Sequence, residues 1–417
     1  MKVSTWCFRG PAGARLVKMG PRRVRWATSA ILLAFPWTIG LATDASAQNI
    51  SVTEGDVQSN VAPTTYDSIT VSGTSALGAP STYTAAADLT LTNGLSVSSS
   101  GVFNANANVT AGGVSSSSDG VINLNAGTLT AGNLSLSGPS SVTRTGGYYS
   151  VSNLYLSNGA SLTYGDGDSI TNYLSLDGAS LSRTRSINAG HFNVSNATLD
   201  LLAGDSFNNP GANNWNPNTV ANGGVLNVNG DVTVAGWVST HSGGVVNLND
   251  GTLTAGVLDL SGPNSLTRTG GHYAVGSLYL SNGASLTYSD GDAITNYLSI
   301  DGISSSFAGY EPLSLNSLSI TNGGVLSLHD FTGSGAMSNW GLRLLGDSQS
   351  FLETLITGSQ ITGSWGPMSV FYDPTSNYTF VTAIAAVPEI DPAGIGSVMA
   401  LVSGTFVLLE RRRRRSA

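Results

Sequence analysis

The stretch LSLSGPSSVTRTGGYYSVSNLYLSNGASLTYGDGDSITNYLSL, residues 134–176, carries the pattern that decides the fold. Pairs of apolar residues in an L-x-L arrangement recur there every 20 residues, at Leu134/Leu136, Leu154/Leu156 and Leu174/Leu176. Alternation with a period of two residues is typical of a β-strand with one buried face. The return of that strand at a fixed, longer period predicts a solenoid, in which each turn of chain packs on the previous turn.

Other positions keep the same rhythm. The L-x-L pairs return at Leu258/Leu260, Leu278/Leu280, Leu298/Ile300 and Leu318/Ile320. Between the pairs lie two further apolar positions and a glycine, at Ile122/Val142/Leu162, Leu129/Tyr149/Ile170 and Gly127/Gly147/Gly167. Three apolar positions per turn, separated by glycine-rich corners, predict three short strands per turn, each paired in parallel with its counterpart about 4.8 Å away. We therefore predict an all-β fold, a parallel β-helix (solenoid) of rungs of about 20 residues.

A longer repeat is superimposed on this rhythm. Residues 121–180 and 245–304 align without a gap at an offset of 124 residues, and most positions are identical. Duplication of rungs is readily accommodated in a solenoid, because each rung contacts only its neighbours. Asparagines also recur by rung, at Asn104/Asn123, Asn106/Asn125, Asn227/Asn247 and Asn229/Asn249. Two interpretations are open for them, a side-chain ladder along the axis or simple tolerance of turns.

These patterns divide the chain. Residues 48–88 are expected to form an N-terminal cap or first strands, residues 89–335 the solenoid, and residues 336–386 a C-terminal cap and linker. Within the C-terminal cap, Asp347 or Ser348 is expected to begin a helix that covers residues 350–357. A final hairpin is expected to pair residues 370–372 with residues 378–381.

Both ends of the chain read as targeting segments. Residues 1–47 have a basic start, an apolar run over residues 27–42 and the small residues Ala45 and Ala47, which predict a signal peptide cleaved after Ala47. An uncleaved N-terminal anchor is the alternative. In residues 387–417, the sequence Val387-Pro388-Glu389 precedes an apolar run of about 17 residues that predicts a transmembrane helix. This run extends from Ala393 to Leu409 and is followed by five arginines expected on the cytoplasmic side, Arg411, Arg412, Arg413, Arg414 and Arg415.

This tail resembles the C-terminal sorting segment of the PEP-CTERM family of exported bacterial proteins. That family usually has a second proline where this chain has Ile390. The resemblance implies passage through the inner membrane, processing by an exosortase-type enzyme, and association with exopolysaccharide or the envelope. It also implies anchoring in the membrane during sorting, and then a place on the cell surface or in the extracellular matrix. Phrases such as GGVLNVNG (residues 223–230) resemble the repeats of autotransporter passenger domains, over roughly residues 89–328, and imply a β-solenoid.

Composition excludes several classes of function. The single cysteine, Cys7, lies in the signal segment, so the exported part can form no disulfide and no thiolate metal site. Between Gln48 and Ala386 there are five arginines, no lysine and 21 acidic residues, which leaves a formal charge of −16. A surface of this sign repels phosphate backbones and argues against a nucleic-acid partner. It suits divalent cations or basic partners, or it serves only solubility.

Two acidic turns are the candidate metal sites. The turn at residues 165–168 contains Asp166 and Asp168, and its copy at residues 289–292 contains Asp290 and Asp292. Calcium sites on loops use such a dense supply of oxygen ligands, so calcium is the one cofactor considered; a solvated acidic turn is the alternative. Arg144 is expected either to pair with Asp166 or Asp168 one rung along or to lie in water at the end of its strand.

Function is less readable than fold. Tyr155 and Tyr279 alternate with buried leucines and are expected to point outward, where they suit sugar rings, protein partners or cross-strand packing. Few cationic residues and scattered histidines favour a protein without enzymatic activity. We predict an exported structural or adhesive solenoid associated with the cell surface or extracellular matrix. The alternatives are a carbohydrate-active β-helix enzyme, either a polysaccharide lyase or a hydrolase, and a calcium-dependent assembly module.

Overall fold

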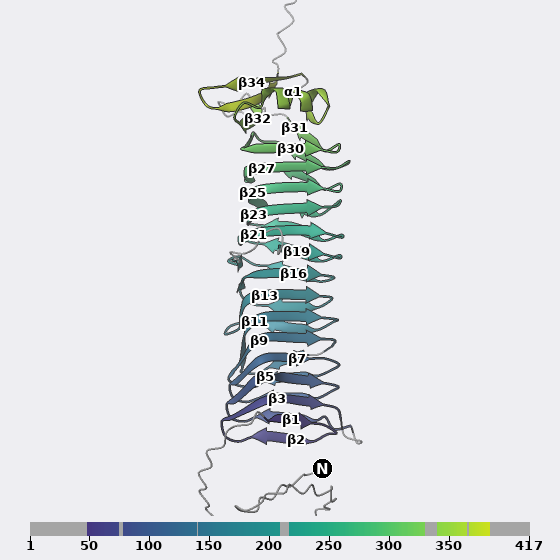
Figure 1. Cartoon of the computed structure of the whole chain (residues 1–417), viewed down its shortest axis with the longest axis vertical. Helices are drawn as coiled ribbons and strands as arrows, with labels where there is room; N and C mark the ends of the chain where they lie inside the picture. Colours follow the sequence, from purple (N-terminus) through teal and green to yellow (C-terminus); the bar gives the residue numbers. More distant parts are fainter. Residues whose placement is uncertain are drawn as a thin grey trace, which may run out of the picture. The chain divides into compact units, whose positions relative to one another are not determined.

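The computed structural model describes residues 48–74, 78–139, 141–208, 217–329, 340–364 and 367–383. They form an all-β parallel solenoid of about 13 turns, with about 3% helix, which confirms the predicted fold class (Figure 1). The signal peptide and the C-terminal sorting tail lie outside these residues, so both stay predictions. No helix within the described ranges is long and apolar enough to cross a membrane.

One sheet contains the long strand of each rung, and its members pair in parallel with the next in this order. They are β1 (Asn49–Val52), β3 (Thr64–Ser72), β5 (Leu89–Ser98), β7 (Val109–Ser116), β9 (Thr128–Ser137), β11 (Tyr148–Ser157), β13 (Ser169–Asp177), β16 (His191–Ser195), β19 (Asn218–Ala221), β21 (Val232–His241), β23 (Thr252–Ser261), β25 (His272–Ser281), β27 (Ala293–Asp301) and β30 (Ser317–Thr321). Two short strands join its side, β15 (Asn188–Ala189) and β18 (Ser206–Phe207).

A second sheet contains the short strands that alternate with the long ones. It runs through β2 (Val57–Asn60), β4 (Thr82–Ala85), β6 (Val102–Ala105), β8 (Val121–Leu124), β10 (Ser141–Arg144), β12 (Ser161–Tyr164), β14 (Ser180–Arg183), β17 (Thr198–Leu201), β20 (Val225–Asn229), β22 (Val245–Asp250) and β24 (Leu266–Arg268). A third sheet continues it with β26 (Ser285–Tyr288), β28 (Ser306–Gly309), β31 (Val325–Leu328) and β33 (Ile361–Gly363).

The long strands differ from the three separate strands per turn that the sequence predicted. In β9, Ala131 and Leu134 are both buried, while Gly132 and Asn133 between them are exposed. Two consecutive outward residues reverse the alternation and bend the strand without ending it. Two of the three predicted strands are therefore the two halves of one bent strand.

The core is a set of stacked apolar columns. Leu134, Leu154 and Leu174 are direct partners in the parallel ladder, and all three are fully buried. Each such side chain contributes about 1.5–3 kcal/mol relative to exposure to water. The in-register pairing explains the 20-residue rhythm, because a shift by one residue would turn every leucine outward.

Residues 48–88, expected as an N-terminal cap or first strands, contain strands of the stack. Strand β1 already pairs with β3, and β2 pairs with β4, so the first strands belong to the regular stack. At the other end, the predicted helix and hairpin are confirmed as α1 (Gln349–Thr357) and as β34 (Met368–Asp373) paired antiparallel with β35 (Tyr378–Ala383). Strand β32 (Trp340–Leu345) joins this hairpin to the solenoid, because it also pairs in parallel with β29 (Leu313–Leu315).

Candidate functional sites

The two acidic turns connect a short strand to the next long strand. Gly167 and Gly291, at the third position of each turn, have φ of +88°. A type II turn requires a positive φ at that position, which explains the glycine. The two carboxylates of each turn differ in their exposure to solvent. Asp166 and Asp290 are exposed, whereas Asp168 and Asp292 are buried.

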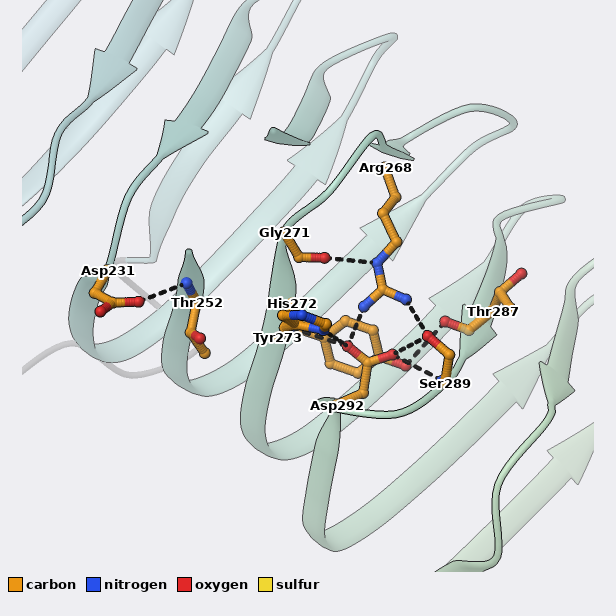
Figure 2. A network of polar contacts seen from close by, with 9 residues as sticks. All are labelled: Asp231, Thr252, Arg268, Gly271, His272, Tyr273, Thr287, Ser289 and Asp292. Carbon is orange, nitrogen blue, oxygen red and sulfur yellow. Dashed lines mark hydrogen bonds and ion pairs between the residues drawn. The ribbon is translucent and has the colours of Figure 1, made fainter. Parts of the chain in front are cut away.

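The buried Asp292 is held by a dense polar network (Figure 2). Its carboxylate pairs with the guanidinium of Arg268 and accepts the backbone N–H of Tyr273 at 3.1 Å and of Ser289 at 2.9 Å. Arg268 also donates from Nε to the carbonyl oxygen of Gly271 at 2.7 Å and from Nη1 to Ser289 Oγ at 2.7 Å. The network therefore satisfies a buried charge and ties two rungs together at one corner.

The first copy has the same arrangement. Asp168 pairs with Arg144 and accepts the N–H of Tyr149 at 3.0 Å and of Gly165 at 2.8 Å. This confirms one of the two expectations for Arg144, the ion pair with an acidic turn one rung along. The alternative, a strand-end arginine in water, does not hold, since the Arg144 side chain is only partly exposed.

A third pair was missed in the sequence. Arg183 Nη2 lies 2.5 Å from Asp205 Oδ2, and Asp205 also accepts the N–H of Ile187 at 2.7 Å and of Leu202 at 2.8 Å. The available signal was Gly204 before Asp205, with φ of +84°, as in the other two turns. We call the three pairs the corner clamps: Arg144–Asp168, Arg183–Asp205 and Arg268–Asp292.

The corner clamps bear on the calcium candidates. Asp168 and Asp292 are each occupied by an arginine and two backbone N–H groups, which leaves exposed Asp166 and Asp290 as the other carboxylates of their turns. Among the residues that the structure describes, no three His, Cys, Asp or Glu side chains gather into a group that could hold a metal ion. The geometry assigns Asp168 and Asp292 a role in holding the corners, and calcium at these turns stays a prediction.

The predicted asparagine ladders are present. Nδ2 of Asn247 donates to Oδ1 of Asn227 at 2.7 Å, and Asn123 donates to Asn104 in the same way at 2.7 Å. The neighbouring pairs, Asn249/Asn229 and Asn125/Asn106, are bonded at 2.9 and 2.8 Å. A ladder that the sequence analysis missed runs through Asn133, Asn153 and Asn172, at the bend of the long strands. These bonds align successive rungs on their outer surface.

Aromatic side chains gather on the outer face of the long-strand sheet. The rings of Trp237 and Tyr279 stack with centroids 5.6 Å apart and an interplanar angle of 18°, and Tyr279 meets Tyr297 at 5.4 Å. We call these three residues the aromatic platform. The first copy pairs Tyr155 with Tyr173 at 5.5 Å. The outward direction predicted for Tyr155 is confirmed, since this side chain is 36% exposed.

The two copies differ in what surrounds these tyrosines. At the offset of 124 residues, Ser135 in the first copy corresponds to Asp259 in the second. In the rung that precedes each copy, Gly113 occupies the place of Trp237, because Gly113 pairs with Asn133 and Trp237 pairs with the equivalent Val257. Where Gly113 and Gly94 lack side chains, a shallow hollow of about 340 Å³ opens on the outer face. The outer face therefore has an indole and a carboxylate beside Tyr279, and a hollow and a hydroxyl at the equivalent places beside Tyr155.

Asp259 is an unusual carboxylate in this chain. Burial raises its pKa above the ordinary 3.8, although the hydrogen bond from Ser239 Oγ at 3.2 Å and the nearby His241 act in the opposite direction. No ion pair within the described part of the chain neutralises it. A partly desolvated carboxylate that no arginine pairs with lowers the stability of the fold at neutral pH.

Replacing Asp259 by asparagine is therefore expected to raise the free energy of unfolding at neutral pH. The folded state holds the Asp259 proton more tightly than the unfolded chain, so stability falls as the pH rises from 3.8 through the raised pKa. The gain in Asp259→Asn should vanish below pH 3.8. Urea unfolding of both proteins across this pH range measures the difference.

Asp301→Asn serves as the control of opposite sign. Hydrogen bonds from Thr321 and Asn322 lower the pKa of Asp301, so its contribution is present above pH 3.8 and is lost as the pH falls through the lowered pKa. This variant should be less stable than the parent at neutral pH. A loss of stability in Asp259→Asn at neutral pH would contradict the assigned effect of burial.

Comparison with known proteins assigns no function to these sites. No protein-family model matches the chain, and neither a curated protein nor a solved structure matches it.

Proposed function

We propose that the protein is exported and works as a structural or adhesive solenoid at the cell surface or in the extracellular matrix. The observation that carries this proposal is the duplicated block, which repeats the same rungs with the same corner clamp and the same outward tyrosine pair. Duplication of this kind lengthens a surface and repeats its chemistry. A longer surface with repeated chemistry suits a structural or adhesive protein, which contacts its partners along its length.

Hydrogen bonds and ion pairs between rungs can stabilise the protein outside the cell without disulfides. Backbone ladders run through successive long strands and short strands, and asparagine ladders and corner clamps add side-chain bonds between rungs. Nearly all backbone polar groups of a stacked rung are satisfied by its neighbours. The bonds that hold such a stack together are therefore supplied by the chain itself.

The route to the surface is proposed from the two ends of the sequence. Ala45 and Ala47 mark the signal-peptide cleavage site, and Val387-Pro388-Glu389 begins the tail that resembles PEP-CTERM sorting segments. In this proposal, the apolar run over residues 393–409 holds the chain in the inner membrane until an exosortase-type enzyme removes the tail. Exopolysaccharide or other surface proteins are the partners that this destination implies.

Determination of both termini of the native protein tests the route. The protein is recovered from membrane, surface and secreted fractions, and its termini are determined by mass spectrometry. In the surface and secreted fractions, it is expected to begin at Gln48 and to end near Glu389. An intact arginine tail in the inner membrane as the sole form would contradict sorting and would make the solenoid a membrane-anchored domain.

A pair of tail variants sharpens the test. Glu389→Ala alters the motif and is expected to accumulate in the inner membrane with its tail intact. Asp391→Asn changes a nearby acid outside the Val387–Glu389 motif and is expected to be processed like the parent. Equal processing of both variants would show that Glu389 is not read during sorting.

A further inference from the structure

The aromatic platform spans strand β23, although none of its three aromatic residues lies on that strand. Trp237 lies on β21 and Tyr279 on β25, whereas β23 lies between these strands in the sheet. Their rings nevertheless stack at 5.6 Å. The two side chains must therefore lean toward each other above β23, whose outward residues in this region are Val257 and Asp259.

This geometry places a carboxylate beside aromatic faces. Asp259 is the direct ladder partner of Ser239 on one side and of Tyr279 on the other. Burial raises the pKa of the Tyr279 phenol, and the neighbouring Tyr297 and the negative charge of Asp259 add to that rise. Aromatic faces attract cations, and a partly buried carboxylate gains most from a positively charged partner. The combination favours an ammonium group.

The surface around the platform favours a polymer rich in hydroxyl groups. Beyond Tyr279, the same outward column continues with Ser299 and then Ser319, which are successive partners in the parallel ladder. Ser277, beside Tyr297 in the neighbouring column, is buried and adds no hydroxyl group to this surface. A chain of sugars that lies along the axis would meet ring faces and then a row of hydroxyl groups.

A peptide ligand fits this place less well. Extended peptides gain affinity by adding to the edge of a sheet, where backbone N–H and C=O groups are free. The platform lies on the face of the sheet, and the backbone groups of β21, β23 and β25 are already paired with one another. Charge also discriminates among glycans. The 21 acidic residues between Gln48 and Ala386 outnumber the five arginines, and the resulting negative charge repels uronic acids and attracts amines.

We propose that the aromatic platform and Asp259 together bind a glycan that carries free amino groups, such as a polymer of glucosamine. The ammonium group of one sugar pairs with Asp259, while the ring of that sugar or of its neighbour stacks on the indole and phenol faces. This inference rests on the proposed function only in placing the ligand outside the cell. The equivalent place beside Tyr155 has Gly113 and Ser135, and it therefore lacks both the indole and the carboxylate.

Calorimetric titration of the full-length protein in mild detergent tests the site. The probes are a glucosamine hexamer and its fully N-acetylated counterpart, at a pH where the amines are protonated and Asp259 is ionised. The parent is expected to bind the free-amine hexamer more tightly than the acetylated one. Asp259→Ser, which copies the first repeat, and Trp237→Ala should each weaken binding by about tenfold.

Tyr155→Ser is the matched control, since Tyr155 is the counterpart of Tyr279 in the copy without the site, and it should bind as the parent does. Circular dichroism checks that each variant is folded, and Asp259→Ser keeps the test valid if Trp237→Ala unfolds. No binding by the parent, equal affinity for the acetylated hexamer, or unchanged affinity in Asp259→Ser would each overturn the proposal. Processed termini with no binding would overturn this site alone, and binding with an intact tail would overturn only the sorting route.

Discussion

Asp205→Ala is expected to lower the free energy of unfolding by about 3–5 kcal/mol, because it leaves a buried arginine without its counter-charge. The side chain of Asp205 is fully buried, and that of Arg183 is only 3% exposed. Two other nitrogens of Arg183, Nε and Nη1, are buried without a hydrogen-bond partner among the described residues. The substitution also removes the acceptor of two backbone N–H groups. Urea unfolding followed by circular dichroism measures the loss.

Asp166→Ala is the matched control, because Asp166 is an exposed acid in the equivalent type of turn. Its removal is expected to change the free energy of unfolding by no more than about 0.5 kcal/mol. The double variant Arg183→Met/Asp205→Leu should recover the part of the loss that comes from the unpaired charge, but not the part that comes from the two backbone N–H groups without an acceptor. A loss in Asp166→Ala as large as that in Asp205→Ala would show that the corner clamp is not the cause.

The fold was predictable because equivalent apolar residues recur along the sequence at a spacing of 20 residues. Leu134, Leu154 and Leu174 are spaced by the length of one rung, and the parallel ladder then places them in one buried column. The bend in the long strands was not predictable as a bend. Gly132 and Asn133 interrupt the alternation in the same way as a corner does, and only the continuous pairing of β9 with β11 distinguishes the two cases.

The sites were predictable only where they repeat. Arg144 and Asp168 were considered together because their copies occur at the same offset. The pair Arg183–Asp205 lies outside the duplicated block and is separated by 22 residues rather than 24, so no repeat pointed to it. The stacking of Trp237 on Tyr279 depends on two side chains leaning over an intervening strand, and sequence spacing does not encode that contact.

Gly251→Ala is expected to destabilise the solenoid by about 3 kcal/mol, since it combines two unfavourable effects. Gly251 has φ of +65°, which an L-residue with a Cβ adopts only at a cost. A Cβ on Gly251 would also lie 2.3 Å from the carbonyl carbon of Gly230 in the neighbouring rung. Because the obstacle is backbone, the two rungs must separate, which weakens the ladder between β20 and β22.

Gly223→Ala separates the two effects. Gly223 has φ of +75°, but a Cβ there would meet nothing within 4 Å, so only the backbone cost of about 1 kcal/mol is expected. The difference between the two variants in urea unfolding therefore measures the contact between rungs. Hydrogen exchange in Gly251→Ala should accelerate in β20 and β22 more than in β5 and β7, because each rung contacts only its neighbours. Uniform acceleration along the chain would contradict that local coupling.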